Sequence, residues 1–95
     1  MDRIEVVRER EAGGGWELTV RVERGGERSA HVVRLSWADH DHWTRGAASP
    51  SATAAAVVRV ALERGEALDE RIDASALARR HADFAERVRA RLGSE

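Results

Sequence analysis

Two alternating segments, WELTVRVER and ERSAHVVRL, leave the centre of this chain little freedom in how it folds. Apolar residues recur at alternate positions in each segment, as in β-strands that bury one face. Gly25 and Gly26 separate the segments, and a two-residue hairpin turn needs positive φ at both of its central positions. The sequence therefore predicts a β-hairpin with strands over about 16–24 and 27–35.

Pairing Arg24 with Glu27 around this turn fixes the register of the hairpin. The pairs expected on the apolar face are Trp16–Leu35, Leu18–Val33 and Val20–His31. The pairs expected on the opposite face join opposite charges and are Glu17–Arg34 and Glu23–Arg28. Because cross-strand pairs of both kinds stabilise a sheet, the two faces favour the same register.

An earlier strand over about 3–11 is predicted from RIEVVRERE, and two registers are open for it. A three-residue loop buries Ile4 and Val6 but produces two pairs of like charges, Glu5–Glu23 and Glu11–Glu17. A four-residue loop relieves these pairs and turns Val7 inward. We favour burial of Ile4 and Val6, which completes a three-stranded antiparallel meander with one apolar face.

Ser36 and Asp39 have the spacing of a capping box, which predicts a short helix over about 37–44. We expect Trp37 and Trp43 to anchor this helix onto the apolar sheet face. The segment is then a helix that begins after an N-cap residue and packs on the sheet through its two tryptophans.

Further helix signals follow at Ser49, an N-cap residue, and at Pro50, which suits the first helical position. They predict a helix over about 50–64 that stops near Gly65. A short amphipathic helical turn is expected over about 67–72, and Asp73 caps a final helix over about 74–92. The buried stripe expected on the final helix is Leu77, His81, Phe84, Val88 and Leu92.

These elements define an α+β fold in a single domain over residues 1–95. Its three-stranded antiparallel meander is followed by two main helices and one or two short helices, all packed on one sheet face. Much of the 42% hydrophobic content is alanine, which contributes less to a core than a large aliphatic side chain does. A thin core gains stability from association, so we expect a homodimer or docking onto another protein.

Composition excludes several classes of protein. Cysteine is absent, which rules out disulfides and thiolate metal sites. The first residues are charged and lack the apolar run of a signal peptide, and no segment approaches the length of a transmembrane helix. We therefore expect a cytoplasmic protein with no membrane partner. A net charge of −1 also argues against nucleic acid as the partner, because nucleic-acid binders usually carry a basic excess.

Several positions follow the pattern H-x-V-x-L-S-x-x-D, then T-x-G, then S-P, then an acidic-aliphatic link into the last helix. The matching residues are His31, Val33, Leu35, Ser36, Asp39, Thr44, Gly46, Ser49, Pro50, Ile72 and Asp73. On these residues the chain, over roughly 20–92, resembles a group of small bacterial proteins of about 90 residues with no assigned function. It departs from their pattern where RRHADF replaces a Tyr-Phe-Pro-type segment. The resemblance implies a compact α+β domain and carries over no catalytic or binding residue.

The segment SWADHDHWTRG is the main candidate for a metal site. A zinc site on a helix uses histidines at i and i+4, whereas His40 and His42 are two apart and diverge. Asp39 and His42 are the better pair of ligands, with His31 or His81 as a third. We favour the alternative in which this segment only caps and docks a helix, and we expect no cofactor.

His31 and His81 both fall on predicted apolar faces. A lone histidine in such a place is usually a hydrogen-bonded core residue. If the final helix packs on the sheet, the two rings could instead meet and act as a switch near neutral pH. The sequence leaves open whether they form a pair.

No catalytic signature is present, since GGG leads into a strand and no serine lies in a G-x-S-x-G elbow. We therefore expect no enzyme and no catalytic residue. The favoured function is a small non-enzymatic protein–protein interaction module, homodimeric or bound to another protein. One alternative is nucleic-acid binding through Arg80, Arg87 and Arg91 of the final helix. The other is metal binding at Asp39 and His42.

Overall fold

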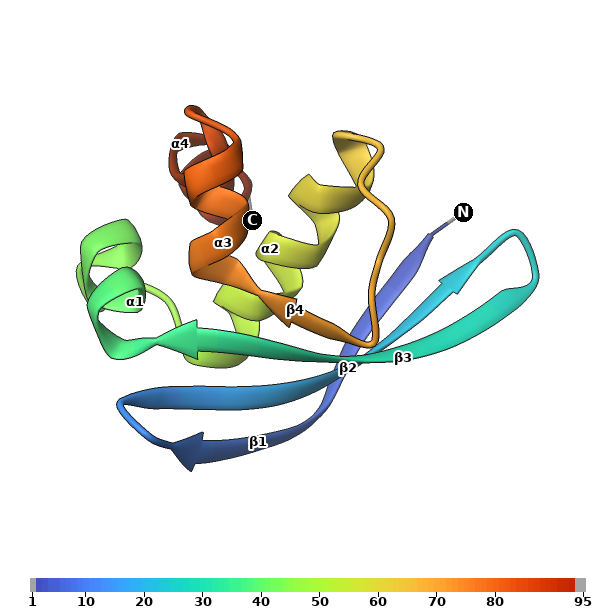
Figure 1. The fold of residues 1–95 in the computed structure, drawn as a ribbon, viewed down its shortest axis with the longest axis horizontal. Helices are drawn as coiled ribbons and strands as arrows, with labels where there is room; N and C mark the ends of the chain where they lie inside the picture. Colours follow the sequence, from blue (N-terminus) through green and yellow to red (C-terminus); the bar gives the residue numbers. More distant parts are fainter. Residues whose placement is uncertain (1, 94–95) are drawn as a thin grey trace.

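The computed structural model describes residues 2–93, so Met1, Ser94 and Glu95 of the predicted domain lie outside the described residues. The elements follow in the order β1 (Arg3–Ala12), β2 (Gly15–Arg24), β3 (Glu27–Ser36), α1 (Trp37–Thr44), α2 (Pro50–Glu63), β4 (Arg71–Asp73), α3 (Ala74–Arg80) and α4 (Phe84–Gly93). The described helices all lie on one side of the sheet (Figure 1). The α+β class and the one-sided packing of the helices are confirmed.

The strands form one sheet in the order β1-β2-β3-β4. The first three are antiparallel as predicted, whereas β4 runs parallel to β3 and pairs with residues 32–34. The predicted helical turn over 67–72 is therefore wrong, although Ile72 is buried as expected. A three-residue strand is too short for alternation to reveal it, and the backbone groups at the edge of β3 provide the partner that selects it.

The hairpin of β2 and β3 has the predicted register throughout, from Arg24 opposite Glu27 to Trp16 opposite Leu35. Gly25 and Gly26 have φ values of 54° and 85°, the left-handed conformation that the turn requires. The glycine turn and the alternation on both faces thus specify the same pairing.

The register of β1 changes at a β-bulge between Val6 and Arg8. On the turn side of the bulge, the pairing is that of the four-residue loop, which keeps glutamates from facing each other. Beyond the bulge the pairing shifts by one residue, so Ile4 and Val6 pack partly buried against the core, as predicted. Val7, the extra residue, is 45% exposed. One inserted residue satisfies both the burial and the charge requirements, which neither uniform register could do.

The hydrophobic core lies between the helices and the inner face of the sheet. Its fully buried strand residues are Leu18, Val20, Val22, Val33 and Leu35. The buried residues that α2 contributes include Ala54, Val57, Val58 and Ala61. These small side chains let α2 lie close to the sheet, and α4 then covers α2 with Phe84 and Val88, both 0% exposed.

The prediction of one final helix over 74–92 is wrong, because α3 ends at Arg80 and α4 begins at Phe84. His81 has extended backbone, with φ −123° and ψ 110°, and its ring bonds to Glu66. The break lets Leu77 of α3 and Phe84 of α4 both reach the core from helices with different axes. The apolar spacing continues across the break, so the pattern alone gave no sign of it.

Helix α1 has the predicted bounds, and Ser36 Oγ accepts a hydrogen bond of 3.0 Å from the Asp39 N–H. Trp43 is buried against Phe84, with ring centroids 6.3 Å apart. Trp37 is 49% exposed and contacts Trp16 of the inner sheet face edge-on, in line with the prediction, whereas the aromatic contact of Trp43 is with Phe84 of α4. Six helical positions place the two tryptophans about 120° apart, which puts only one of them in the core.

Candidate functional site

The sheet face opposite the helices is strongly charged, and we call it the open face. Alternation along the strands defines its members. Its arginines are Arg3, Arg8, Arg10, Arg21, Arg28, Arg34 and Arg71. Its acidic residues are Glu5, Glu17, Glu23 and Asp73. Arginines outnumber acidic residues on this face although the whole chain has a net charge of −1, so positive charge is concentrated on one side of the molecule.

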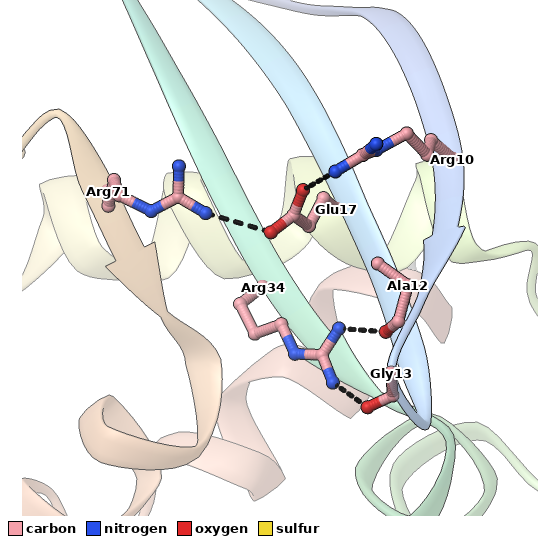
Figure 2. A network of polar contacts seen from close by, with 6 residues as sticks. All are labelled: Arg10, Ala12, Gly13, Glu17, Arg34 and Arg71. Atoms are coloured by element: carbon pink, nitrogen blue, oxygen red, sulfur yellow. Dashed lines mark hydrogen bonds and ion pairs between the residues drawn. The ribbon is translucent and has the colours of Figure 1, made fainter.

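Glu17 of β2 lies at the centre of a network on the open face (Figure 2). Its Oε1 accepts a 2.7 Å hydrogen bond from Arg10 of β1, and its Oε2 accepts a 2.8 Å hydrogen bond from Arg71 of β4. The hydrogen bond from Arg10 is the main cause of the lowered pKa of Glu17. The side chains of Arg10 and Arg71 remain 60% and 67% exposed. One carboxylate thus orders two guanidinium groups that still face solvent.

Arg34 of β3 supplies a third ordered guanidinium group to this network (Figure 2). Its Nη1 and Nη2 donate to the carbonyl oxygens of Ala12 and Gly13 at the turn between β1 and β2. Arg34 lies opposite Glu17 in the sheet as predicted, but the two side chains bond to other partners. Because carbonyl oxygens are neutral, these bonds fix the guanidinium group without cancelling its charge.

The open face also holds looser ion pairs, and a shallow hollow lies beside the Glu17 network. Arg28 Nε lies 3.1 Å from Glu23 Oε2, which is the predicted pair. Arg21 Nη1 lies 3.7 Å from Glu5 Oε1. The hollow has a volume of about 220 Å³, and its lining residues are Arg8, Arg10, Glu17, Thr19, Val32 and Arg71. Arginine stays protonated and only donates hydrogen bonds, while a carboxylate with a lowered pKa is a weak base. The arrangement is therefore suited to holding anions and poorly suited to proton transfer.

Asp39 and His42, the predicted pair of metal ligands, lie in different surroundings. Asp39 accepts a hydrogen bond from Ser75 at the start of α3, and His42 is exposed on α1. His40 Nε2 lies 2.7 Å from the carbonyl oxygen of Ala48. Within residues 2–93, no group of three or more His, Cys, Asp or Glu side chains is placed to hold a metal ion. Asp39 instead connects α1 to α3.

His31 and His81 bond to other residues and not to each other in the described part of the chain. His31 is 6% exposed, and its Nδ1 lies 2.6 Å from the Asp69 carbonyl oxygen, to which it donates. In the neutral ring, Nε2 then accepts from Ser29 Oγ at 2.8 Å. His81 Nε2 bonds to Glu66 Oε1 at 2.6 Å, and this bond is the main cause of the lowered pKa of Glu66. Both histidines therefore hold the connection between α2 and β4.

The three arginines of the nucleic-acid alternative do not share one helix. Arg80 lies on α3, whereas Arg87 and Arg91 lie on α4. Their carboxylate partners are, respectively, Glu66, Asp83 and Glu63. Each of these three arginines thus lies beside a carboxylate, and they do not form one basic stripe.

Sequence reasoning found the alternating charges of β2 and β3 but treated them only as cross-strand pairs. Arg71 was missed because residues 67–72 were assigned to a helical turn, and the sheet brings this residue to Glu17 over a long sequence separation. A count of charges on the favoured meander gave no signal, because glutamates outnumber arginines on its outer positions. The bulge in β1 brings Arg8 and Arg10 to the open face and takes Glu9 and Glu11 away from it.

Comparison with protein-family models, curated proteins and solved structures gives no match. In the part of the chain that the structure describes, none of the helices is long and apolar enough to cross a membrane. Function therefore has to be inferred from the geometry of this chain.

Proposed function

We propose that this protein is a small non-enzymatic protein–protein interaction module that binds its partner through the open face. The observation that carries the proposal is the surplus of ordered, exposed arginines on a face that no described helix covers. Side chains already restricted by hydrogen bonds lose less freedom when a partner binds, which favours affinity. The open face thus has the charge and the order of a binding surface.

Charge favours a partner that is not a second copy. Two open faces brought together would oppose like charges, which disfavours association. The apolar stripe of the final helix offers little to a second copy, because Phe84 and Val88 are fully buried within the chain. The free edge of β1 carries a bulge and charged side chains, which hinder strand pairing between copies. We therefore expect a complex with a different, acidic protein.

The use of the polar side chains supports a non-enzymatic role. Asp39 bonds to Ser75, His40 bonds to the carbonyl oxygen of Ala48, and His81 bonds to Glu66. Each of these bonds joins one element or connection to another. These side chains, which the sequence offered as candidates for metal binding or titration, thus make hydrogen bonds that hold parts of the fold together.

Site-specific photo-crosslinking in the cells that express the protein tests the proposal. A photoreactive amino acid replaces Thr19, at the middle of the open face, or Ala82, which is exposed between α3 and α4. We expect one defined protein to crosslink from position 19 and not from position 82. That protein, once purified, should bind the chain with an affinity that falls as salt increases. Equal crosslinking from both positions, or binding that salt does not change, would contradict the proposal.

A further inference from the structure

We infer that Arg10, Arg34 and Arg71 form a carboxylate-binding centre that recognises an acidic segment of the partner protein. The inference rests on the proposed function and specifies the chemistry of the partner. The three guanidinium groups come from β1, β3 and β4; Arg10 and Arg71 flank a single carboxylate, that of Glu17 on β2, and Arg34 bonds to the nearby turn between β1 and β2 (Figure 2). The centre therefore carries a local excess of positive charge.

Each guanidinium group keeps hydrogen-bond donors for a ligand. A guanidinium group has five N–H donors, and Arg10 and Arg71 each use one terminal nitrogen on Glu17. Arg34 uses its two terminal nitrogens on backbone carbonyl groups, so its charge has not been matched by these bonds. A carboxylate offers two oxygens that fit the guanidinium fork, and such charge-assisted hydrogen bonds are among the stronger ones in proteins.

The spacing of the arginines indicates the shape of the ligand. The terminal nitrogens of Arg10 and Arg71 bond to the two oxygens of one carboxylate at 2.7 and 2.8 Å, so they are at most about 8 Å apart. In an extended peptide, alternate side chains lie on one face and are separated by about 7 Å. An extended segment with acidic residues at alternate positions can therefore contact both arginines, with Arg34 further along the face at the turn between β1 and β2.

Phosphate groups would satisfy the same arginines, so nucleic acid is the competing ligand. Aromatic rings that stack with bases usually supply much of the affinity for single strands. None of the residues that alternation places on the open face is aromatic. The exposed ring of Trp37 contacts Trp16, whose side chain belongs to the inner face. The open face therefore fits the carboxylates of a protein better than a nucleic-acid strand.

The test measures binding of a fluorescein-labelled ten-residue peptide of alternating Glu and Ser to the full chain by fluorescence anisotropy. We expect the Arg10→Ala/Arg71→Ala variant to lose affinity by about tenfold. The matched control, Arg79→Ala/Arg89→Ala, removes two exposed arginines of the helix layer and should lose less than about twofold. A peptide with Gln in place of Glu should not bind. Both open-face arginines are more than half exposed, so the variant should fold, as circular dichroism can verify.

Three results would overturn the inference. The first is an equal loss of affinity in the two double variants, because binding would then depend on total charge. The second is no binding of the glutamate peptide to the wild-type chain. The third is tighter binding of a ten-nucleotide oligothymidine with the same dependence on Arg10 and Arg71, which would identify phosphate as the ligand.

Failure of this inference is distinguishable from failure of the proposed function. A partner that crosslinks from position 19 through a segment without acidic residues would leave the interaction module standing and refute the carboxylate-binding centre. Conversely, binding of the glutamate peptide without any crosslinked protein would support the centre and contradict the proposed function.

Discussion

The inner face and the open face of the sheet are made by the same strands, yet the inner face is buried beneath the helices and the open face is exposed to solvent. On the inner face, Leu18 and Leu35 are 0% exposed beneath the helices. On the open face, Arg10 and Arg71 remain mostly exposed and are held by Glu17. Because neighbouring residues of a strand point to opposite sides, one sequence serves both faces. We therefore expect inner-face residues to determine stability and open-face residues to determine the proposed binding, so that mutations can affect the two independently.

The largest loss of stability is expected from the inner side. Phe84 is 0% exposed and packs against Trp43, so Phe84→Ala should lower the free energy of unfolding by about 3–5 kcal/mol. Urea denaturation measures this loss. Trp37→Ala is the matched control, since Trp37 is half exposed and should cost far less. Similar losses for the two substitutions would contradict the assignment of the core to Phe84 and Trp43.

The next largest loss of stability is expected at Gly15, where the backbones of β2 and β3 approach closely. A Cβ atom at Gly15 would lie 2.3 Å from the carbonyl oxygen of Leu35 and 2.8 Å from Cα of Ser36. Backbone atoms cannot move aside cheaply, so Gly15→Ala should destabilise the fold by about 1–3 kcal/mol. Gly93→Ala is the control, because a Cβ atom there meets nothing within 4 Å. The same thermal midpoint for both variants would show that the two strands do not approach this closely at Gly15.

Acid should weaken both sides of the sheet through one glutamate on each. The pKa values of Glu17 on the open face and Glu66 in the helix layer are lowered by hydrogen bonds from Arg10 and His81. Such groups stabilise the fold fully above their unfolded pKa, near 4.5, and lose this contribution as pH falls through the folded pKa. Stability should therefore fall below pH 4.5, and less steeply in Glu17→Gln and Glu66→Gln variants. The measurement is the thermal midpoint as a function of pH, above and below 4.5, for wild type and both variants. If the midpoints of the variants fall with pH as steeply as that of wild type, neither glutamate makes this contribution.

The smallest effect on stability is expected from the arginines of the open face. Arg10→Ala and Arg71→Ala each remove an exposed ion pair, and such pairs contribute little to folding. Urea denaturation should therefore give free energies of unfolding close to wild type. A loss comparable to that of Phe84→Ala would mean that the open face supports the fold, and the division between the two faces would fail.

Much of the fold was predictable because its signals are local. The glycine turn and two alternating faces specified the β2–β3 hairpin, and Ser36 and Ser49 marked the starts of α1 and α2. The errors lie where distant contacts override local pattern. Strand β4 exists because the edge of β3 pairs with it, and the break between α3 and α4 occurs where His81 bonds to Glu66.

The candidate site was less predictable than the fold. Its arginines on β2 and β3 were placed correctly on the outer face, but the contact of Arg71 with Glu17 depends on β4. Asp39 and His42 drew attention because of their residue types, and the structure gives Asp39 a bond to Ser75 and leaves His42 exposed. The surplus of arginines on the open face arises only because the bulge in β1 places Arg8 and Arg10 there and β4 adds Arg71.

The separation of the two faces is tested most directly by nuclear magnetic resonance of the labelled chain during addition of the alternating Glu–Ser peptide. The account predicts that the Nε–H signals of Arg10, Arg34 and Arg71 shift together, with the amides of their strands. The signals of Arg79 and Arg89 on the helices should stay in place. Shifts concentrated on the helices, with the three open-face arginines unmoved, would contradict the assignment of binding to the open face.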